Sequence, residues 1–408
     1  MSPPENVSVY CHVPFCLAKC PYCDFYSASA GDLGMDPWQY FELVERELDV
    51  LCCEDERLRS RRLVTFYVGG GTPTLVEPGA YRRFFERLCG AFELDPSFEW
   101  TLEANPGTLD EKRRTDNRQL TTDNGLGTTG GPDRLDAFLA LGVNRLSIGV
   151  QSFSDETLEQ LGRRHRSAEA RALLDQLRDA GRPQPIWAID LIFGAPGQTL
   201  SQWQADLDEA IAYRPHHCSV YGLTIHEGTP FGDQQRAGHL DLPDEETQRE
   251  MFLLARRRLT LAGYEHYEIS NYALPGCRSR HNERYWTGGD YLGLGVAAHS
   301  QIGGIRWSNP PDLALYRESL ATGRLPRRIE RPPGDRARVG EQVMLGLRRL
   351  EGIDLAAFRS RFGVDLAETY SREIARLAGG RLVEIVDGRL RLSEAGLLVA
   401  DAVMAEFF

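Results

Sequence analysis

The sequence has 408 residues, of which 42% are hydrophobic and 26% are charged, with a formal net charge of −12 at pH 7. These proportions are ordinary for a globular protein, and the length favours one large domain with a smaller one. The acidic balance argues against broad binding to a nucleic-acid backbone, and no apolar run reaches the roughly 18 residues that a membrane span needs.

Apolar strand-like runs alternate with amphipathic helical segments through the first half of the chain. The expected strands are Val7–Val13, Leu63–Val68, Phe98–Ala104, Arg145–Val150, Ile186–Phe193 and Cys218–Leu223, with helices at Trp38–Leu51, Tyr81–Phe92, Ala168–Ala180 and Leu200–Ala212. Strands separated by such helices imply right-handed βαβ units, a parallel sheet and an α/β fold. Ligands of such sheets bind at the carboxyl ends of the strands.

The first strand leads into a loop with three cysteines, Cys16, Cys20 and Cys23, at C-x3-C-x2-C spacing. Thiolates spaced in this way can point at a common centre, and they suit zinc, copper(I) or an iron–sulfur cluster. Three thiolates do not complete a structural zinc site, and no matching fourth Cys or His follows closely. They can hold three irons of a [4Fe–4S] cube and leave the fourth iron open to a substrate or cofactor.

This spacing resembles the cluster loop of the radical S-adenosylmethionine (SAM) superfamily. The longer strings Tyr10-x-His12-x-Pro14-Phe15-Cys16 and Cys20-Pro21-Tyr22-Cys23-Asp24-Phe25 resemble the family of the coproporphyrinogen III dehydrogenase HemN and the haem chaperone HemW. HemN enzymes carry a further Cys two residues after the third, where Phe25 stands here, which favours the HemW branch. The resemblance implies a partial (βα)6 TIM-like barrel that binds a [4Fe–4S] cluster and SAM.

The resemblance extends along the strand ends. The run Gly69-Gly70-Gly71-Thr72 allows a ligand to come close to the backbone and resembles the segment that receives the amino end of SAM. Arg163, in Leu161-Gly-Arg-Arg-His165, suits the SAM carboxylate because its planar fork matches that group, and Asp190 resembles the position that reaches the ribose. The residues assigned to SAM by this resemblance are Tyr10, Tyr22, Gly70, Gly71, Thr72, Glu103, Gln151, Arg163 and Asp190.

We expect the chain to form three parts: a radical SAM core at 1–235, a segment at 236–330 that covers the barrel mouth, and a C-terminal domain at 331–408. Polar residues at 112–132 without apolar periodicity predict a flexible insertion in the core. In the middle segment, His281-Asn-Glu-Arg-Tyr-Trp286 and Gly293-x-Gly-x-x-Ala-His299-Ser resemble family motifs. They are open to two interpretations: His281 as an axial haem ligand, or packing with each His hydrogen-bonded, which is favoured for His299.

The C-terminal domain is expected to be winged-helix-like, with helices at Ala337–Leu347, Leu355–Arg361 and Leu366–Leu377, a hairpin through Asp387-Gly388, and a last helix at Glu394–Glu406. Asp-Gly is typical of a type I′ turn. Such domains often bind DNA, but the acidity of the chain weighs against it. The arginines from Arg324 to Arg349 are interpreted as a solvated face or an interdomain contact, and Cys218 and Cys277 as inert thiols.

The resulting hypothesis is a haem chaperone that binds haem, a [4Fe–4S] cluster and SAM and delivers haem to apo-haemoproteins, with peripheral contact to membrane haemoproteins open. The alternative is an enzyme, an oxygen-independent coproporphyrinogen III dehydrogenase that uses a 5′-deoxyadenosyl radical; we expect that activity to be absent. A third option is a DNA-binding regulator with a redox cluster. The N-terminus lacks a secretory signal, and nine scattered cysteines with an open cluster suit reducing conditions, so we expect a cytoplasmic protein.

Overall fold

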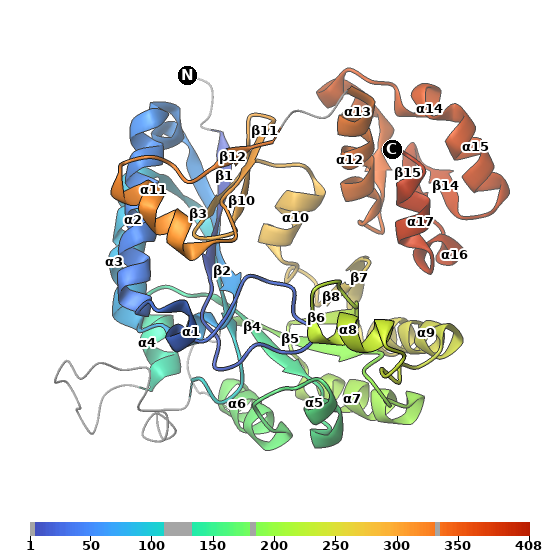
Figure 1. Cartoon of the computed structure of the whole chain (residues 1–408). Helices are drawn as coiled ribbons and strands as arrows, with labels where there is room; N and C mark the ends of the chain where they lie inside the picture. Colours follow the sequence, from blue (N-terminus) through green and yellow to red (C-terminus); the bar gives the residue numbers. More distant parts are fainter. Residues whose placement is uncertain (1–4, 110–132, 180–184, 331–334) are drawn as a thin grey trace.

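The computed structural model describes residues 5–109, 133–179, 185–330 and 335–408, so the predicted insertion at 112–132 lies outside the described residues. The described residues form a large hydrophobic core built on residues up to Leu320, a small one from Val339 to Phe407, and a minor cluster of Leu161, Ile192 and Ala195. The large core lies between a curved sheet and the helices on its outer side, and the small core forms a separate C-terminal unit (Figure 1).

Six parallel strands form the centre of the large unit, as the sequence predicts. They are β1 (Asn6–Val13), β2 (Arg62–Gly70), β3 (Glu93–Ala104), β4 (Arg145–Gln151), β5 (Ile186–Phe193) and β6 (His217–Gly222), adjacent in chain order. The helices and 3-10 turns of this unit are α1 (Ala30–Leu33), α2 (Pro37–Glu54), η1 (Glu56–Ser60), η2 (Pro73–Leu75), α3 (Pro78–Ala91), α4 (Arg134–Ala140), α5 (Asp155–Gln160), α6 (Ser167–Asp179), α7 (Leu200–Tyr213), α8 (Pro230–Arg236), α9 (Glu245–Leu261) and α11 (Leu313–Ala321). The expected α/β partial barrel is confirmed.

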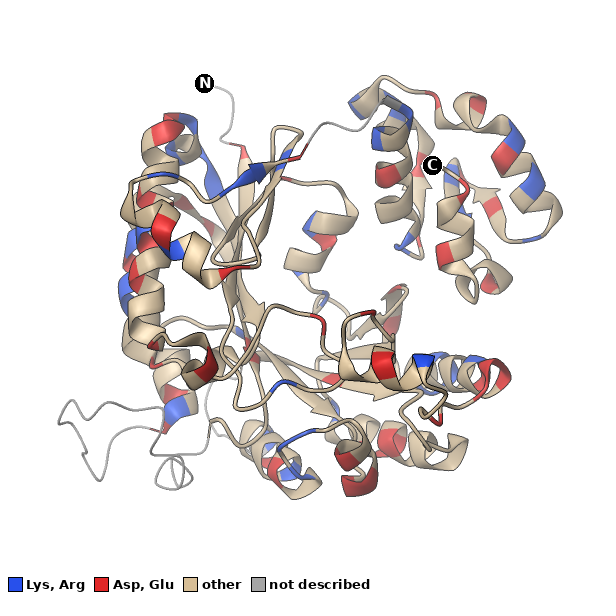
Figure 2. Cartoon of the chain, viewed as in Figure 1, with Lys and Arg blue, Asp and Glu red and all other residues tan. Residues whose placement is uncertain are grey.

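Helix starts follow local capping chemistry. Asp36 caps α2 by accepting from the backbone of Trp38, and Thr199 forms a capping box with Gln202 at the start of α7. The apolar side of α2 buries Phe41, Val44 and Leu48 against the sheet, while charged residues of both signs lie on the outer helices (Figure 2). None of the helices in the described part of the chain is long and apolar enough to cross a lipid bilayer.

The middle segment extends the sheet at both edges. The strands are β7 (Glu265–Glu268), β8 (Asn271–Ala273), β9 (Tyr291–Leu294), β10 (His299–Ile302), β11 (Ile305–Ser308) and β12 (Arg328–Ile329), giving twelve strands in the order β12-β11-β10-β9-β1-β2-β3-β4-β5-β6-β8-β7. β9 is parallel to β1, whereas β8 is antiparallel to β6. The sheet is therefore mixed, with a parallel centre and antiparallel margins.

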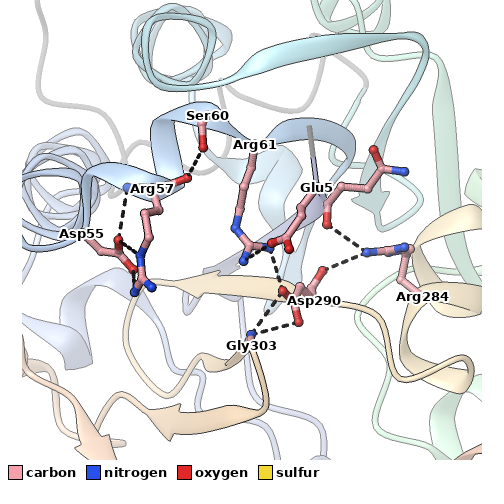
Figure 3. A network of polar contacts seen from close by, with 9 residues as sticks. Glu5, Asp55, Arg57, Ser60, Arg61, Arg284, Asp290 and Gly303 are labelled. Atoms are coloured by element: carbon pink, nitrogen blue, oxygen red, sulfur yellow. Dashed lines mark hydrogen bonds and ion pairs between the residues drawn. The ribbon is translucent and has the colours of Figure 1, made fainter. Parts of the chain in front are cut away.

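An ion-pair network fixes β9 beside β1. The Arg61 guanidinium, which is almost buried, pairs with Glu5 at 2.8 Å and with Asp290 at 2.6 Å (Figure 3). Asp290 also accepts from the backbone N–H of Gly303 at 3.1 Å, and Arg284 donates to the carbonyl of Asn6 at 3.1 Å. The amino ends of β1, β2 and β9 are thus tied to the hairpin that follows β9.

The short helix α10 (Arg280–Trp286), which carries the His281 motif, lies inside the curve of the sheet (Figure 1). Its first backbone N–H groups, those of Arg280 and His281, donate to the Glu99 carboxylate at 3.3 and 3.2 Å. His281 reaches Thr65, five residues before the carboxyl end of β2. This position differs from the expected cover over the barrel mouth, because the polar start of α10 is held deep against β2 and β3.

The C-terminal unit contains α12 (Asp335–Leu347), β13 (Ile353–Asp354), α13 (Leu355–Phe362), α14 (Leu366–Thr369), α15 (Ser371–Gly379), β14 (Val383–Val386), β15 (Arg389–Leu392), α16 (Glu394–Leu397) and α17 (Ala400–Ala405). Its sheet is three-stranded and antiparallel, in the order β13-β15-β14. Asp387 and Gly388 have φ of 50° and 74°, as the predicted type I′ turn requires. The small α+β domain with a hairpin wing is therefore confirmed.

Two helices predicted in this unit are broken. The expected helix Leu366–Leu377 is interrupted at Tyr370, whose φ of −112° is not helical and whose buried ring packs on Phe407. The expected helix Glu394–Glu406 is interrupted at Val399, with φ of −130°. Packing against the small core overrides the helical pattern of the sequence at both places.

The C-terminal unit docks on the middle segment through polar contacts. The Ile269 N–H donates to the carbonyl of Arg348 at 3.1 Å, and the Arg348 guanidinium stacks 4.6 Å from the Trp286 ring. Arg361 donates to the carbonyls of Thr287 and Gly288. Part of the predicted arginine-rich stretch is therefore an interdomain contact.

Candidate functional site

A cavity of about 420 Å³ opens at the carboxyl ends of the parallel strands and continues into the barrel. Its walls come from the cysteine loop after β1 and from β2 to β6. Eleven residues assigned from the sequence line this one cavity: Cys16, Cys20, Tyr22, Cys23, Gly70, Gly71, Thr72, Glu103, Gln151, Arg163 and Asp190. Strand ends distant in sequence are thus brought to a common space, as expected for a parallel sheet.

The cysteine loop is closed at its base by strand-like pairing. Phe15 pairs with Ala28, and the Cys16 N–H donates to the Ala28 carbonyl at 2.9 Å. Buried His12, from the sequence motif, supports the same base because its Nε2 is 2.8 Å from the Tyr26 carbonyl oxygen. The three loop cysteines are consequently held on a short, fixed excursion from β1.

The three thiols are free and partly accessible. Burial raises the pKa of the Cys16 and Cys23 thiols, so binding a cation would favour their thiolate forms. Across residues 5–109, 133–179, 185–330 and 335–408, no three His, Cys, Asp or Glu side chains are grouped closely enough for a single metal ion. A cluster places each thiolate on a different iron, and this donor set fits three ligands of a [4Fe–4S] group.

The glycine run brings β2 against the cysteine loop. Gly70 has φ of 109°, and a Cβ there would lie 2.5 Å from the His12 ring. At Gly71 a Cβ would lie 2.6 Å from the Phe15 carbonyl oxygen and 3.0 Å from Cys16 Sγ. Only residues without a Cβ permit this approach, so the run positions the loop as well as lining the cavity.

Arg163 connects the strand ends to the cysteine loop. Its guanidinium donates to the Asn105 side chain, to the Gly149 carbonyl at 3.2 Å, and to Cys20 Sγ at 3.6 Å. Its Nε is buried without a hydrogen-bond partner. An unused donor on a buried cation fits an incoming carboxylate such as that of SAM.

Two partly buried carboxyl groups, those of Glu103 and Asp190, line the same cavity. Glu103 accepts from Tyr67 Oη at 2.7 Å and from the Gly70 N–H at 3.0 Å, and burial raises its pKa to about 7. Asp190 accepts from Ser147 Oγ at 3.0 Å, and burial also raises its pKa. These groups can accept hydrogen bonds from amino and hydroxyl groups of a ligand.

Gln151 ends β4 with φ of 65°, in the left-handed region that a non-glycine residue rarely adopts. The strand pairing with β5 is shifted at this point, between Ile148 and Gln151. Two buried contacts hold the turn: His165 Nε2 lies 3.1 Å from the Val150 carbonyl oxygen, and Asp206 accepts from the Phe153 N–H at 2.7 Å. The strained conformation keeps Gln151 on the cavity wall.

Tyr10 stands apart from the other assigned residues. It is not among the residues that line the cavity. Its hydroxyl is hydrogen-bonded to His12 Nδ1 at 3.1 Å, and burial raises its pKa. The structure therefore gives Tyr10 a supporting place behind the cysteine loop.

His281 is placed as a structural residue. Its residue exposure is 1%, Nδ1 lies 2.8 Å from Thr65 Oγ1, and Nε2 lies 2.9 Å from Tyr285 Oη. Burial lowers its pKa to about 3. Both ring nitrogens are occupied, so a role as haem ligand would require breaking both bonds and opening the barrel interior, which argues against that assignment. His299 is exposed and lies 3.7 Å from Glu330.

Several cavity residues were not identified from the sequence: Tyr67, Thr101, Asn105, Arg145, Ser147, His217, Ser219, Tyr221 and His226. Three of them, Thr101, Asn105 and Ser147, lie two or four residues from Glu103 or Gln151, whereas β6 carries no assigned residue. The period of two along a strand places such residues on the same face, so that spacing was a usable signal. His226, in the loop after β6, gave no such signal.

Comparison with known proteins places these features in context. Residues 10–210 match the family model of the radical SAM superfamily, and residues 335–399 match that of the HemN C-terminal domain. "Heme chaperone HemW" of Escherichia coli K12 is 36% identical over 297 residues, which cover 72% of this chain and 70% of that protein. "Heme chaperone HemW" of Mycobacterium tuberculosis H37Rv is 32% identical over 403 residues, covering 98% of this chain and 95% of that one.

Among solved structures, the coproporphyrinogen III oxidase HemN of E. coli, described as a radical SAM enzyme, superposes with a TM-score of 0.78. The superposition covers 99% of this chain and 90% of that one, at 23% sequence identity. At this identity the likeness establishes a shared fold.

Proposed function

Since the chain belongs to the radical SAM superfamily and, within it, to the family of the heme chaperone HemW, we propose that it is a haem chaperone. In this proposal it binds haem, a [4Fe–4S] cluster and SAM in the cytosol and delivers haem to apo-haemoproteins, including those at a membrane. The observation that carries the proposal is a cavity that joins the three-cysteine loop to the assigned SAM residues, with Phe25 beyond the third cysteine.

The cluster and SAM are assigned to the upper part of the cavity. Cys16, Cys20 and Cys23 would hold the cluster, and the unused Nε of Arg163 would meet the SAM carboxylate. When bound, such a cluster can supply an electron to SAM. The chain contributes fixed positions: Arg163 donates to Cys20 Sγ, and Thr72 Oγ1 donates to Cys16 Sγ at 3.8 Å.

His226 is the candidate haem ligand that the geometry favours over His281. Its side chain is 44% exposed and lines the open end of the cavity, where Nδ1 lies 3.5 Å from the Asp24 carboxylate. A carboxylate beside one ring nitrogen orients an imidazole and leaves the other nitrogen for iron. Phe25, 60% exposed, and Tyr221, 42% exposed, line the same opening and can pack on a porphyrin face.

The test is a haem titration of anaerobically reconstituted protein, followed by absorbance near the Soret band. We expect His226→Ala to weaken haem binding at least about tenfold, the order of an axial-ligand loss. His239→Ala, an exposed histidine after α8, is the matched control. Equal binding by both variants would remove His226 from the site. Absence of any spectral change with wild-type protein would refute the chaperone proposal.

The alternative function shares the same pocket and needs a separate assay. Conversion of coproporphyrinogen III with consumption of SAM would favour the dehydrogenase and contradict the chaperone. Haem transfer from the loaded protein to apomyoglobin, without such conversion, would support the chaperone. A DNA-binding role has little support, because arginines of the C-terminal unit pair with acids, as Arg336 does with Glu373 at 2.7 Å. Basic and acidic residues are interspersed on this unit (Figure 2).

A further inference from the structure

The closed end of the cavity holds a set of polar groups that the assigned SAM residues do not use. Thr101 on β3, Arg145 on β4 and His217 on β6 all line it, with residue exposures of 1%, 2% and 2%. Thr101 pairs with Arg145 across β3 and β4, and His217 pairs with Ala188 across β5 and β6. Thr101 and Arg145 therefore lie on one row of the sheet, two residues before Glu103 and Ser147, and His217 lies on the row of Ser147 and Ala188. The Arg145 charge lowers the pKa of His217, so these two side chains lie near each other in the interior.

Arg145 is a buried cation without a carboxylate partner. Its Nη1 donates to the Cys277 carbonyl at 3.0 Å, and no ion pair of Arg145 lies within the described ranges. Its charge reaches the nearby Asp190, whose pKa it lowers against the larger, raising effect of burial. Glu103 and Asp190 already accept hydrogen bonds from Tyr67 and Ser147. A guanidinium in this situation favours an anionic ligand, because burying it with a single neutral acceptor is costly.

His217 adds a second donor. Tyr267 Oη accepts from the Ser279 N–H at 3.3 Å and lies 2.8 Å from His217 Nε2, a spacing that allows the tyrosine hydroxyl to donate to that nitrogen. Burial and nearby Arg145 keep the pKa of His217 well below its usual range, which makes the ring neutral. In the tautomer in which Tyr267 donates, the imidazole proton is on Nδ1, a buried atom without a hydrogen-bond partner.

Thr101 Oγ1 is the third group, also buried and without a partner. Buried polar groups are nearly always paired, so two such atoms in the cavity that Arg145 lines indicate a binding site for a polar ligand. Space for it comes from small side chains on the cavity wall, those of Ser147 and Ser219.

We propose that the closed end of the cavity is a binding site for the carboxylate of a small organic ligand, held by Arg145, His217 Nδ1 and Thr101 Oγ1. The planar fork of an arginine matches a carboxylate. A doubly charged phosphate is disfavoured, because the carboxyl groups of Glu103 and Asp190 line the same cavity. The site uses none of the residues assigned to SAM and is independent of haem, so its failure and that of the chaperone proposal are separable.

The test uses 3,3,3-trifluoropropionate as a probe, observed by 19F NMR line broadening with the cluster-reconstituted protein. We expect wild-type protein to broaden the carboxylate signal at probe concentrations up to about 20 mM, and to leave that of 3,3,3-trifluoropropionamide sharp. Arg145→Gln should weaken binding at least about tenfold, because a hydrogen bond to a charged group is lost. Arg145→Lys should retain part of the affinity, and Arg372→Gln, on the exposed face of α15, should retain all of it.

Thr101→Val keeps the test decisive if Arg145→Gln does not fold. It preserves shape and removes only an unpartnered hydroxyl, so the protein should stay folded with unchanged iron content while binding falls several-fold. Equal broadening of the amide signal, unchanged affinity in both Arg145→Gln and Thr101→Val, or no broadening with wild-type protein would each overturn the proposal. Displacement of the probe by inorganic phosphate as effectively as by propionate would overturn the assignment to a carboxylate.

Discussion

Gly71→Ala tests whether the glycine run positions the cluster loop. The Gly71 N–H donates to the Val13 carbonyl at 2.7 Å, and the next N–H, of Thr72, donates to the Phe15 carbonyl at 2.7 Å. An added methyl would meet the Phe15 oxygen at 2.6 Å, the Val13 oxygen at 2.9 Å and Cys16 Sγ at 3.0 Å. Two of these neighbours are backbone atoms, which cannot swing away as a flexible side chain could.

The magnitude follows from the shortest contact. Ordinary contact begins at 3.4 Å, so the Phe15 carbonyl must retreat by about 0.8 Å, and the adjoining Cys16 moves with it. Overpacking of a well-packed site costs about 1–3 kcal/mol. We expect the midpoint of thermal unfolding to fall by several degrees. Because ligand placement governs cluster binding, loss of the cluster to a chelator should be about tenfold faster or more.

The assay follows absorbance of the reconstituted cluster near 400 nm after addition of chelator, beside iron and sulfide determination. Gly90→Ala is the matched control, since it lies in α3 with nothing within 4 Å of the added Cβ. Its helical site should gain up to about 1 kcal/mol. If Gly71→Ala loses its cluster no faster than Gly90→Ala, the glycine run does not position the loop.

Three further predictions concern the same cavity. The pKa of Glu103 is raised to about 7, so its carboxyl group is ionised above that pH and protonated below it. The affinity for cationic SAM, measured by equilibrium dialysis, should therefore fall about tenfold from pH 8 to pH 6. Glu103→Gln should remove this pH dependence; if the dependence persists in the variant, Glu103 is not its source. Arg163→Lys should weaken SAM binding about 10- to 100-fold, because lysine cannot span Asn105 and the ligand together; wild-type affinity would contradict this. Cys20→Ala should abolish iron content and Cys277→Ala should not; full iron in the former would refute the cluster assignment.

The parallel core was predictable from sequence because each strand is a short apolar run between amphipathic helices. Val7–Val13 and Ile186–Phe193 are strands at nearly these limits. Because ligands bind at the carboxyl ends of parallel strands, the predicted strand ends also indicated residues of the cavity wall, such as Gln151 and Asp190. The edges of the sheet were not predictable, because three- and four-residue strands such as Asn271–Ala273 owe their form to their partners.

The location of His281 inside the barrel was not predictable from the sequence pattern. A short polar and aromatic helix carries no signal for whether it lies over a barrel or inside it. The contacts that hold His281 inside the barrel come from Thr65 and Glu99, which lie 216 and 182 positions before it in the sequence. Similarly, Thr65 and Thr101 alternate with apolar residues, a pattern that normally predicts a solvent-facing side.

The polar interior links stability to ligand binding in this barrel. A barrel interior is commonly filled by branched apolar side chains, whereas this one presents Ser147, Ser219 and buried ionisable groups to a cavity. Burial raises the pKa of Glu103 and Asp190, which means that ionising them costs free energy in the protein interior. Ligands that satisfy these groups bind the folded state alone, so each should raise the unfolding midpoint in proportion to the logarithm of its concentration. The interior thus presents polar groups to a cavity where apolar packing would be more stable. Natural proteins commonly accept such a loss of packing at functional sites.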